Sequence, residues 1–151
     1  MKLITSFQNG KEIPVRFTCL GQNISPPFFI SDLPPGTASL VVVLLDQDAK
    51  PRPWIHWFLF NIPVYSARNG EDMIPEGATQ GLANNNSFGY EGPCPKYFVG
   101  THHYQLIAYA LSEKLPHNAE IDYYSIQEEL DRLTIDKKSI TGLCTRPDNL
   151  K

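Results

Sequence analysis

Six consecutive apolar residues at positions 40–45 constrain the fold of this chain more than any other feature. They do not alternate with polar residues, so a strand built from them must be covered on both faces. The run is also too short for a typical helix. A strand that is buried on both sides is typical of the core of a β-sandwich. The run therefore predicts a layered β fold.

The rest of the chain is also predicted to be mainly β. Thirteen prolines and ten glycines divide it into apolar runs of strand length, rich in β-branched or aromatic residues. The clearest further strands are predicted at residues 55–62 and 104–111. Shorter strands are predicted at residues 3–7, 13–17, 28–30 and 140–145.

One short helix is predicted near the C-terminus. It begins at Ser125, which forms a capping-box pattern with the glutamate three residues later. Ile126, Leu130 and Leu133 fall on one helical face, and we expect the helix to pack on the edge of the sheet. Residues 63–101 are rich in Gly, Asn and Pro and are predicted to form a long, structured loop region, a type of segment that often carries function.

Length and charge narrow the class of protein. The 151 residues predict a single domain spanning 1–151, large enough to bury a core without metal or disulfides. A net charge of -3 and the lack of a long Lys/Arg run argue against a nucleic-acid partner. No apolar run is long enough to cross a bilayer, and the N-terminus lacks a signal-peptide core. A cytoplasmic protein without a transmembrane segment is therefore predicted.

The three cysteines, Cys19, Cys94 and Cys144, are predicted to be free thiols. Their number is odd, they are widely separated, and they form no CxxC pair, which favours neither a disulfide framework nor a zinc site. Cys94 stands between two prolines, and nothing in that pattern predicts an activated thiolate. A catalytic cysteine is therefore not expected.

Two stretches each combine a histidine with an aromatic residue. Because residues two apart share one face of a strand, Trp54 lies beside His56, and His102 lies beside Tyr104. If the two strands lie side by side, these four side chains could line one cavity with an apolar wall and hydrogen-bonding tips. Each histidine alone is more typical of a hydrogen-bonded core residue. The repeated spacing favours a shared site.

Two carboxylates directly follow the apolar run. Asp48 fits a turn cap and a functional group equally well. Asp46, at the end of a buried strand, is expected to lie beside an imidazole. A carboxylate next to His56 would raise the pKa of that histidine and favour an imidazolium that receives anions near neutral pH.

The segment Gly92-Pro93-Cys94-Pro95 is predicted to form a rigid rim of the same pocket. Proline fixes the backbone, and Gly92 would let a ligand approach the main chain closely. An ordinary proline-rich turn is the alternative interpretation.

Two catalytic alternatives stay open. A divalent transition metal could be held by a set of carboxylates and imidazoles, as in a metal-assisted hydrolase, although no HxH or HExxH spacing supports it. That set would be Asp46, Asp48, His56 and His102. A serine triad lacks its G-x-S-x-G marker.

In their order along the chain, these motifs resemble the phosphatidylethanolamine-binding protein family, in particular its short bacterial and archaeal branch, the Raf kinase inhibitor-like proteins. The matching segments are GQNISPP at 21–27, DQDA at 46–49, HW and NIP within 56–63, GPCP at 92–95 and HHY at 102–104. The resemblance implies a large antiparallel β-sheet packed against a smaller antiparallel sheet, with a short C-terminal helix.

The resemblance also implies a non-enzymatic protein with an anion pocket and no cofactor or metal. Its ligands would be phosphate, acetate or a phosphorylated head group such as phosphoethanolamine. A protein kinase or protease is a further expected partner, because several family members inhibit such enzymes by binding, and a homodimer is expected on the same basis. The pocket would be lined by Asp46, Asp48, Trp54, His56, Gly92, Pro93, His102 and Tyr104.

The chain departs from the family pattern at a few positions. Gln47 and Lys50 stand where proline is usual, and Cys144 replaces an aromatic residue in a G-x-Y-x-R ending. His103 replaces the usual arginine, and strand alternation predicts that its side chain points away from His102.

Overall fold

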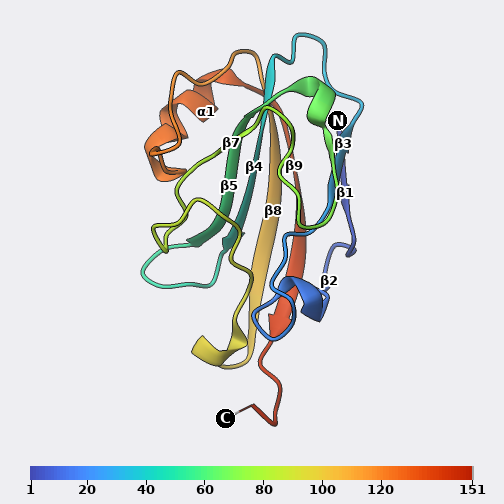
Figure 1. Cartoon of the computed structure of the whole chain (residues 1–151), viewed down its shortest axis with the longest axis vertical. Helices are drawn as coiled ribbons and strands as arrows, with labels where there is room; N and C mark the ends of the chain where they lie inside the picture. The colour runs from blue at the N-terminus through green and yellow to red at the C-terminus, as the bar shows by residue number, and fades with distance from the viewer. Residues whose placement is uncertain (151) are drawn as a thin grey trace.

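The computed structural model describes residues 1–150 and contains two β-sheets that pack face to face (Figure 1). The larger sheet has six strands, in the spatial order β2 (Lys11–Glu12), β9 (Thr134–Thr145), β8 (Thr101–Leu111), β4 (Ser39–Asp46), β5 (Trp54–Ile62) and β7 (Thr79–Gln80). The smaller sheet has the order β1 (Lys2–Thr5), β3 (Phe28–Ser31) and β6 (Arg68–Asn69).

The helical elements are short. The α-helix is α1 (Gln127–Leu133), and four 3-10 turns are η1 (Val15–Phe17), η2 (Val64–Ser66), η3 (Pro95–Tyr97) and η4 (Tyr124–Ile126). This architecture confirms the predicted fold class. Pairings between neighbouring strands are antiparallel, except that β2 runs parallel to β9.

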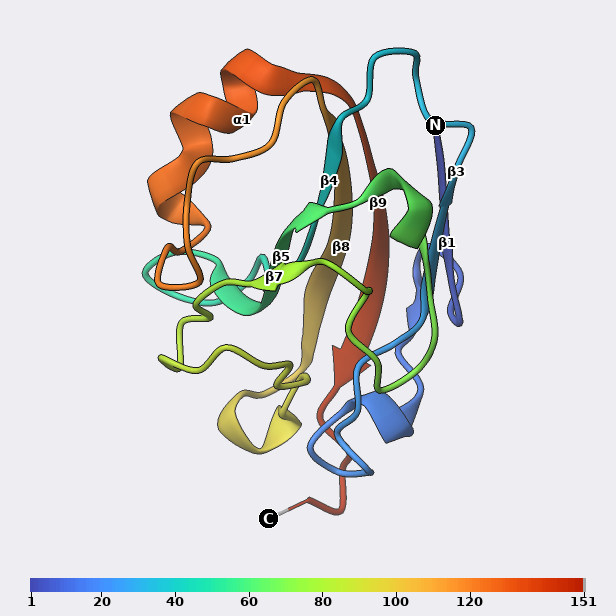
Figure 2. The same ribbon diagram turned by 45° about the horizontal axis from the view of Figure 1, so that its top comes forward.

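Strand β4 forms the centre of the large sheet, as its apolar run predicts. All eight of its residues are buried, and it pairs with β5 on one side and β8 on the other. Leu40, Val42 and Leu44 pack toward the small sheet, whereas Val41 and Val43 belong to the core on the opposite face. Figure 2 shows the two layers that cover this sheet, with α1 on one side and β1 and β3 on the other.

The helix covers a face of the large sheet, so the prediction that it packs on the edge is wrong. Ile126, Leu130 and Leu133 lie in the same apolar core as Val41 and Val43 of β4. The predicted capping box is also wrong. The backbone N–H and the hydroxyl of Ser125 both donate to the carboxylate of Asp122, and α1 begins only at Gln127. The carboxylate of Asp122 therefore caps the turn that precedes the helix.

The predicted strand at residues 13–17 is wrong for a similarly local reason. Only its first residue bonds to a strand, through the Ile13 N–H and the carbonyl of Leu143. Pro14 then lacks an N–H for the ladder, and the chain turns into η1, whose Val15 carbonyl accepts bonds from Thr18. The other predicted strands are confirmed with small differences at their ends, except that the strand predicted at residues 140–145 is the second half of β9, which begins at Thr134.

We expect that replacing Leu40 with Ala destabilises the fold by about 2–5 kcal/mol, because this fully buried side chain of β4 would leave a cavity. Urea unfolding followed by tryptophan fluorescence measures the change. The matched control is Val99→Ala at a position that is 82% exposed, for which a change within about 0.5 kcal/mol is expected. Equal stabilities of the two variants would contradict the central place of β4 in the core.

Candidate functional site

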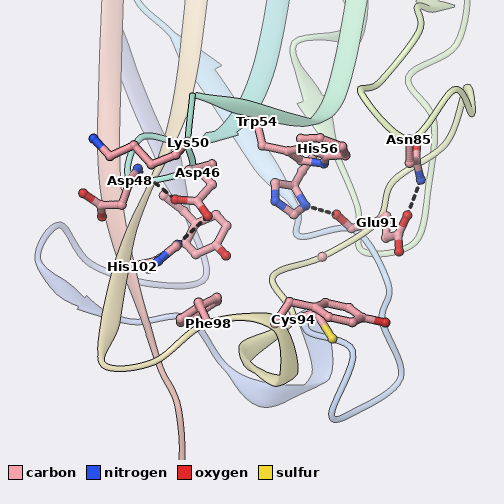
Figure 3. Close-up of a pocket in the computed structure, with 14 residues that line it drawn as sticks. Asp46, Asp48, Lys50, Trp54, His56, Asn85, Glu91, Cys94, Phe98 and His102 are labelled. Carbon is pink, nitrogen blue, oxygen red and sulfur yellow. Dashed lines mark hydrogen bonds and ion pairs between the residues drawn. The ribbon is translucent and has the colours of Figure 1, made fainter. Parts of the chain in front are cut away.

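A cavity of about 560 Å³ opens where β4 ends and β5 and β8 begin, next to the 85–98 loop (Figure 3). Trp54 and Lys50 lie on one side of the imidazoles, and Phe98 and Cys94 lie on the opposite side. The lining residues are Asp46, Asp48, Ala49, Lys50, Trp54, His56, Asn85, Glu91, Gly92, Cys94, Tyr97, Phe98, His102 and Tyr104.

The two histidine-bearing strands meet at this cavity but are not neighbours. Strand β4 lies between them, and its last residue, Asp46, is opposite Trp54 on β5 and opposite Tyr104 on β8. Strand pairing thus places a carboxylate between the two His-aromatic pairs. The expected convergence of these side chains is confirmed, although a third strand separates the two that carry them.

His102 is held on two sides. Its Nδ1 lies 2.6 Å from the Oδ2 atom of Asp46, whose side chain is buried. The ring lies nearly flat against Phe98, with 3.8 Å between the ring centroids and 11° between their planes. Because a carboxylate accepts, we assign the proton to Nδ1, which leaves Nε2 for a ligand. Asp46 was expected beside an imidazole, and that imidazole is His102.

His56 is held differently, through the main chain. Its Nδ1 donates to the carbonyl of Glu91 at 2.6 Å, and the N–H of Glu91 donates back to the carbonyl of His56. Burial lowers the pKa of His56 below its usual value of 6.5 and outweighs the bond to Glu91 and the charge of Asp46, which raise it. The prediction of a raised pKa is therefore wrong. At neutral pH, His56 is neutral and its Nε2 carries a lone pair.

Tyr104 completes the floor of the cavity. It is buried, and its ring meets that of His56 edge to face at a centroid distance of 5.3 Å. Burial, helped by the nearby charge of Asp46, raises the pKa of Tyr104 far above its usual value. The phenol therefore keeps its proton and can act as a donor at any physiological pH.

Asp48 lies at the rim and is bound by His103. Its Oδ2 accepts from the backbone N–H of His103 at 2.6 Å and from the ring Nδ1 at 2.8 Å. Partial desolvation would raise the pKa of Asp48, but these bonds prevail and lower it. His103 is half exposed and is not one of the lining residues, which agrees with the expected direction of its side chain.

The Gly92-Pro93 segment packs closely against the N-terminal part of the chain. A Cβ on Gly92 would lie 2.0 Å from the carbonyl oxygen of Phe17, and the Gly92 N–H already donates to Asn23. Glycine is thus needed for close packing on the N-terminal segment, and the close approach of a ligand to Gly92, which lines the cavity, stays a prediction. Pro93 is buried, its carbonyl accepts from Cys19, and it is not one of the lining residues.

The prediction of three free thiols is also wrong. Cys19 and Cys94 form a disulfide although 75 positions separate them, because the chain after η1 returns beside the 90–94 segment with the two Cα atoms 5.1 Å apart. Sequence spacing could not reveal this approach. Cys144 is free and buried, and burial raises the pKa of its thiol to about 12.

Several lining residues were not predicted, in particular Lys50, Glu91, Tyr97 and Phe98. Lys50 lies two residues after Asp48, so its closeness in sequence was a usable signal. The others lie in a segment that contains η3, where neither strand nor helix periodicity applies. Their approach to His56 and His102 depends on tertiary contacts.

Residues 1–150 hold neither a cluster of metal-ligating side chains nor a helix that could span a membrane. No group of three or more His, Cys, Asp or Glu side chains there is arranged to hold a metal ion. The four residues considered for a metal do not form such a group, and Asp46 and Asp48 each bond to a histidine instead. No helix in this part of the chain is long and apolar enough to cross a membrane. A cytoplasmic location stays a prediction.

Comparisons with known proteins identify the family of this chain. The family model for phosphatidylethanolamine-binding protein matches residues 4–145. A UPF0098 protein of Methanothermobacter thermautotrophicus is 33% identical over 146 residues, which cover 93% of this chain and 95% of the relative. The chain therefore belongs to the phosphatidylethanolamine-binding protein family.

Two solved structures are also similar. A homologue of phosphatidylethanolamine-binding protein from Chlamydia trachomatis superposes with a TM-score of 0.88 at 30% identity, covering 96% of this chain and 97% of the other. YbcL of E. coli, described as a member of the mammalian family, gives a TM-score of 0.87 at 27% identity, with 95% and 97% covered. These likenesses confirm the fold and the family predicted from the motifs.

We expect His56 to titrate below pH 6.5 in the folded protein, because the poorly hydrated surroundings of its ring disfavour the charged form. The unfolded chain then binds more protons than the folded one between the two pKa values. Stability should therefore fall as the pH drops from about 6.5 through the lower folded-state pKa of His56. An NMR pH titration of the ring, assigned with His56→Gln, measures this pKa. A value at or above 6.5 would contradict the assignment.

Proposed function

We propose that this chain is a non-enzymatic binding protein for a small anion or a phosphorylated head group such as phosphoethanolamine. The observation that supports this most is the arrangement of the two histidines. Each has its Nδ1 bonded to a protein acceptor, the carboxylate of Asp46 or the carbonyl of Glu91. Both Nε2 atoms are therefore left for a ligand, beside the phenol of Tyr104 in the same cavity.

The charge state of the ligand should change with pH together with that of the site. A phosphomonoester has a second pKa near 6, so both of its ionic forms exist near neutral pH. Neutral His56 can accept a bond from a protonated phosphate oxygen, and protonated His56 can donate to an ionised one. An anion beside His56 also favours the imidazolium, so binding should be coupled to proton uptake.

Bare phosphate should bind weakly. Hydrogen bonds to charged groups contribute roughly 1.5–3 kcal/mol each, and much of this is offset when the ion leaves water. Three carboxylates, those of Asp46, Asp48 and Glu91, also line the cavity and oppose a second negative charge. A ligand that carries both charges would suit this mixture better than a simple anion.

A cationic group would fit on the side of the cavity away from His102. Glu91 lies there, its carboxylate contacts the amide of Asn85, and the exposed ring of Trp54 is close by (Figure 3). An ammonium group could meet both the carboxylate and the indole face. A cavity of about 560 Å³ has space for more than phosphate alone, so these contacts favour a phosphoethanolamine-like zwitterion.

The chemistry of the lining residues favours binding over catalysis. The lining holds no serine or threonine, and the sulfur of Cys94 is tied in the disulfide. The phenol of Tyr104 is too weakly acidic to act as a nucleophile near neutral pH. Inhibition of a kinase or protease, and a homodimer, stay predictions from the family resemblance.

Calorimetric titrations with phosphate and phosphoethanolamine test the proposal. We expect His56→Ala and His102→Ala each to weaken both ligands by about 10- to 100-fold, because each removes a ligand contact. Glu91→Gln should weaken phosphoethanolamine selectively. His117→Gln, which changes a histidine bonded to Glu129 outside the cavity, is the control and should bind as the wild type does. Equal heats from the wild type and both alanine variants would contradict the site.

A further inference from the structure

One short segment contacts both histidines, and we call residues 91–98 the strap. At its start, the carbonyl of Glu91 accepts from Nδ1 of His56. At its end, the ring of Phe98 lies flat against His102. In Figure 3 a dashed line joins His56 to Glu91, and Phe98 lies toward the His102 side of the cavity. The orientation of both imidazoles therefore depends on how the strap itself is held.

Arg146 holds the C-terminal end of the strap from outside the cavity. Arg146 directly follows β9. Its Nη1 lies 3.1 Å from the carbonyl oxygens of Pro95 and Lys96, and 3.3 Å from that of Phe98. Its backbone N–H donates to the carbonyl of Gly100. The carbonyls at the end of a 3-10 turn lack partners within the turn, and the guanidinium supplies them here.

From this geometry we propose that Arg146 is a positioning residue of the anion site. The inference rests on the proposed function, because it concerns the same pocket. Arg146 fixes the turn that presents Phe98, and Phe98 with Asp46 restricts the ring of His102 on two sides. Without the guanidinium, the three carbonyls lose their donor and the turn η3 becomes less constrained. The ring of His102 then gains conformational freedom, which a ligand must remove again on binding.

The test compares Arg146→Ala and Phe98→Leu with Arg132→Ala, a matched control at an exposed position of α1. The first readout is the NMR shift of the His102 ring protons, which the stacked Phe98 ring should displace upfield in the wild type. Both test variants should lose this displacement and bind phosphate about 3- to 10-fold more weakly. The control should change neither value.

Two failures can be told apart. If wild-type protein does not bind phosphate or phosphoethanolamine, the proposed function fails. If the wild type binds, but Arg146→Ala keeps both the wild-type affinity and the His102 ring shift, the positioning role fails. Arg146→Lys, which keeps the charge without the planar fork of donors, should fall between the wild type and Arg146→Ala.

The disulfide carries a second, independent inference. Cys94 lies within the strap and lines the cavity, and both half-cystines are partly exposed to solvent. The same stretch of chain is also held by weaker bonds, from the Gly92 N–H to Asn23 and from the Tyr90 hydroxyl to the carbonyl of Phe17. The strap therefore has one anchor that a reductant can open and others that it cannot.

We infer that anion binding responds to the redox state of Cys19 and Cys94. A dithiol would deliver two electrons and two protons to the S–S bond, giving two cysteine thiols while the dithiol closes to its own disulfide. The remaining hydrogen bonds would keep the strap in place but less constrained. The bond between Glu91 and His56 would then be less well defined, and affinity should fall without unfolding.

Phosphate titrations with and without dithiothreitol test this inference, with thiol counting to establish reduction. The reduced wild type should bind about 3- to 10-fold more weakly and recover after reoxidation. A double variant, Cys19→Ser with Cys94→Ser, should bind like the reduced protein, and its affinity should not change with dithiothreitol. That result would exclude Cys144 as the source of the redox response. An unchanged affinity after two new thiols appear would overturn the inference. A purified protein in which all three cysteines are already thiols would overturn it as well.

Discussion

The burial of β4 on both faces is the constraint on which the rest of this structure depends. A strand without a polar side needs a layer above and below, and the small sheet and the helical segment supply them. Its last residue, Asp46, carries that burial into the site, because a carboxylate with little access to water needs a hydrogen-bonding partner. His102 on the adjacent strand meets this need, and one imidazole of the cavity is thereby fixed.

His56 and His102 each lie two residues from an aromatic residue, but their surroundings differ chemically. His102 faces a carboxylate, whereas His56 faces a backbone carbonyl, which offers a dipole in place of a full charge. Burial can therefore lower the pKa of His56 without a nearby ion pair to reverse it. Such a site holds one imidazole against a carboxylate and the other against a carbonyl, a difference that a count of its histidines would not reveal.

Local patterns predicted most of the fold and about half of the lining of the site. The apolar run revealed β4, and a two-residue period found Trp54 with His56 and His102 with Tyr104. The errors arose where a single residue overrides a pattern, as Pro14 does in the predicted strand at 13–17. Other contacts join segments far apart in sequence. The pairing of Cys19 with Cys94 and the approach of Phe98 to His102 belong to this class, and no local period encodes them.

The disulfide also divides the molecule topologically. It closes a covalent ring that contains β4, β5 and His56, whereas β8, β9 and His102 lie outside it. The cavity is therefore built across the junction of the cyclic part and the linear part that follows it, residues 95–150. If the structure opens locally, the strands after the ring can separate from the sheet while the disulfide stays closed. His102 would then leave the cavity with them. The cavity is therefore complete only while the strands after the ring stay paired with those inside it.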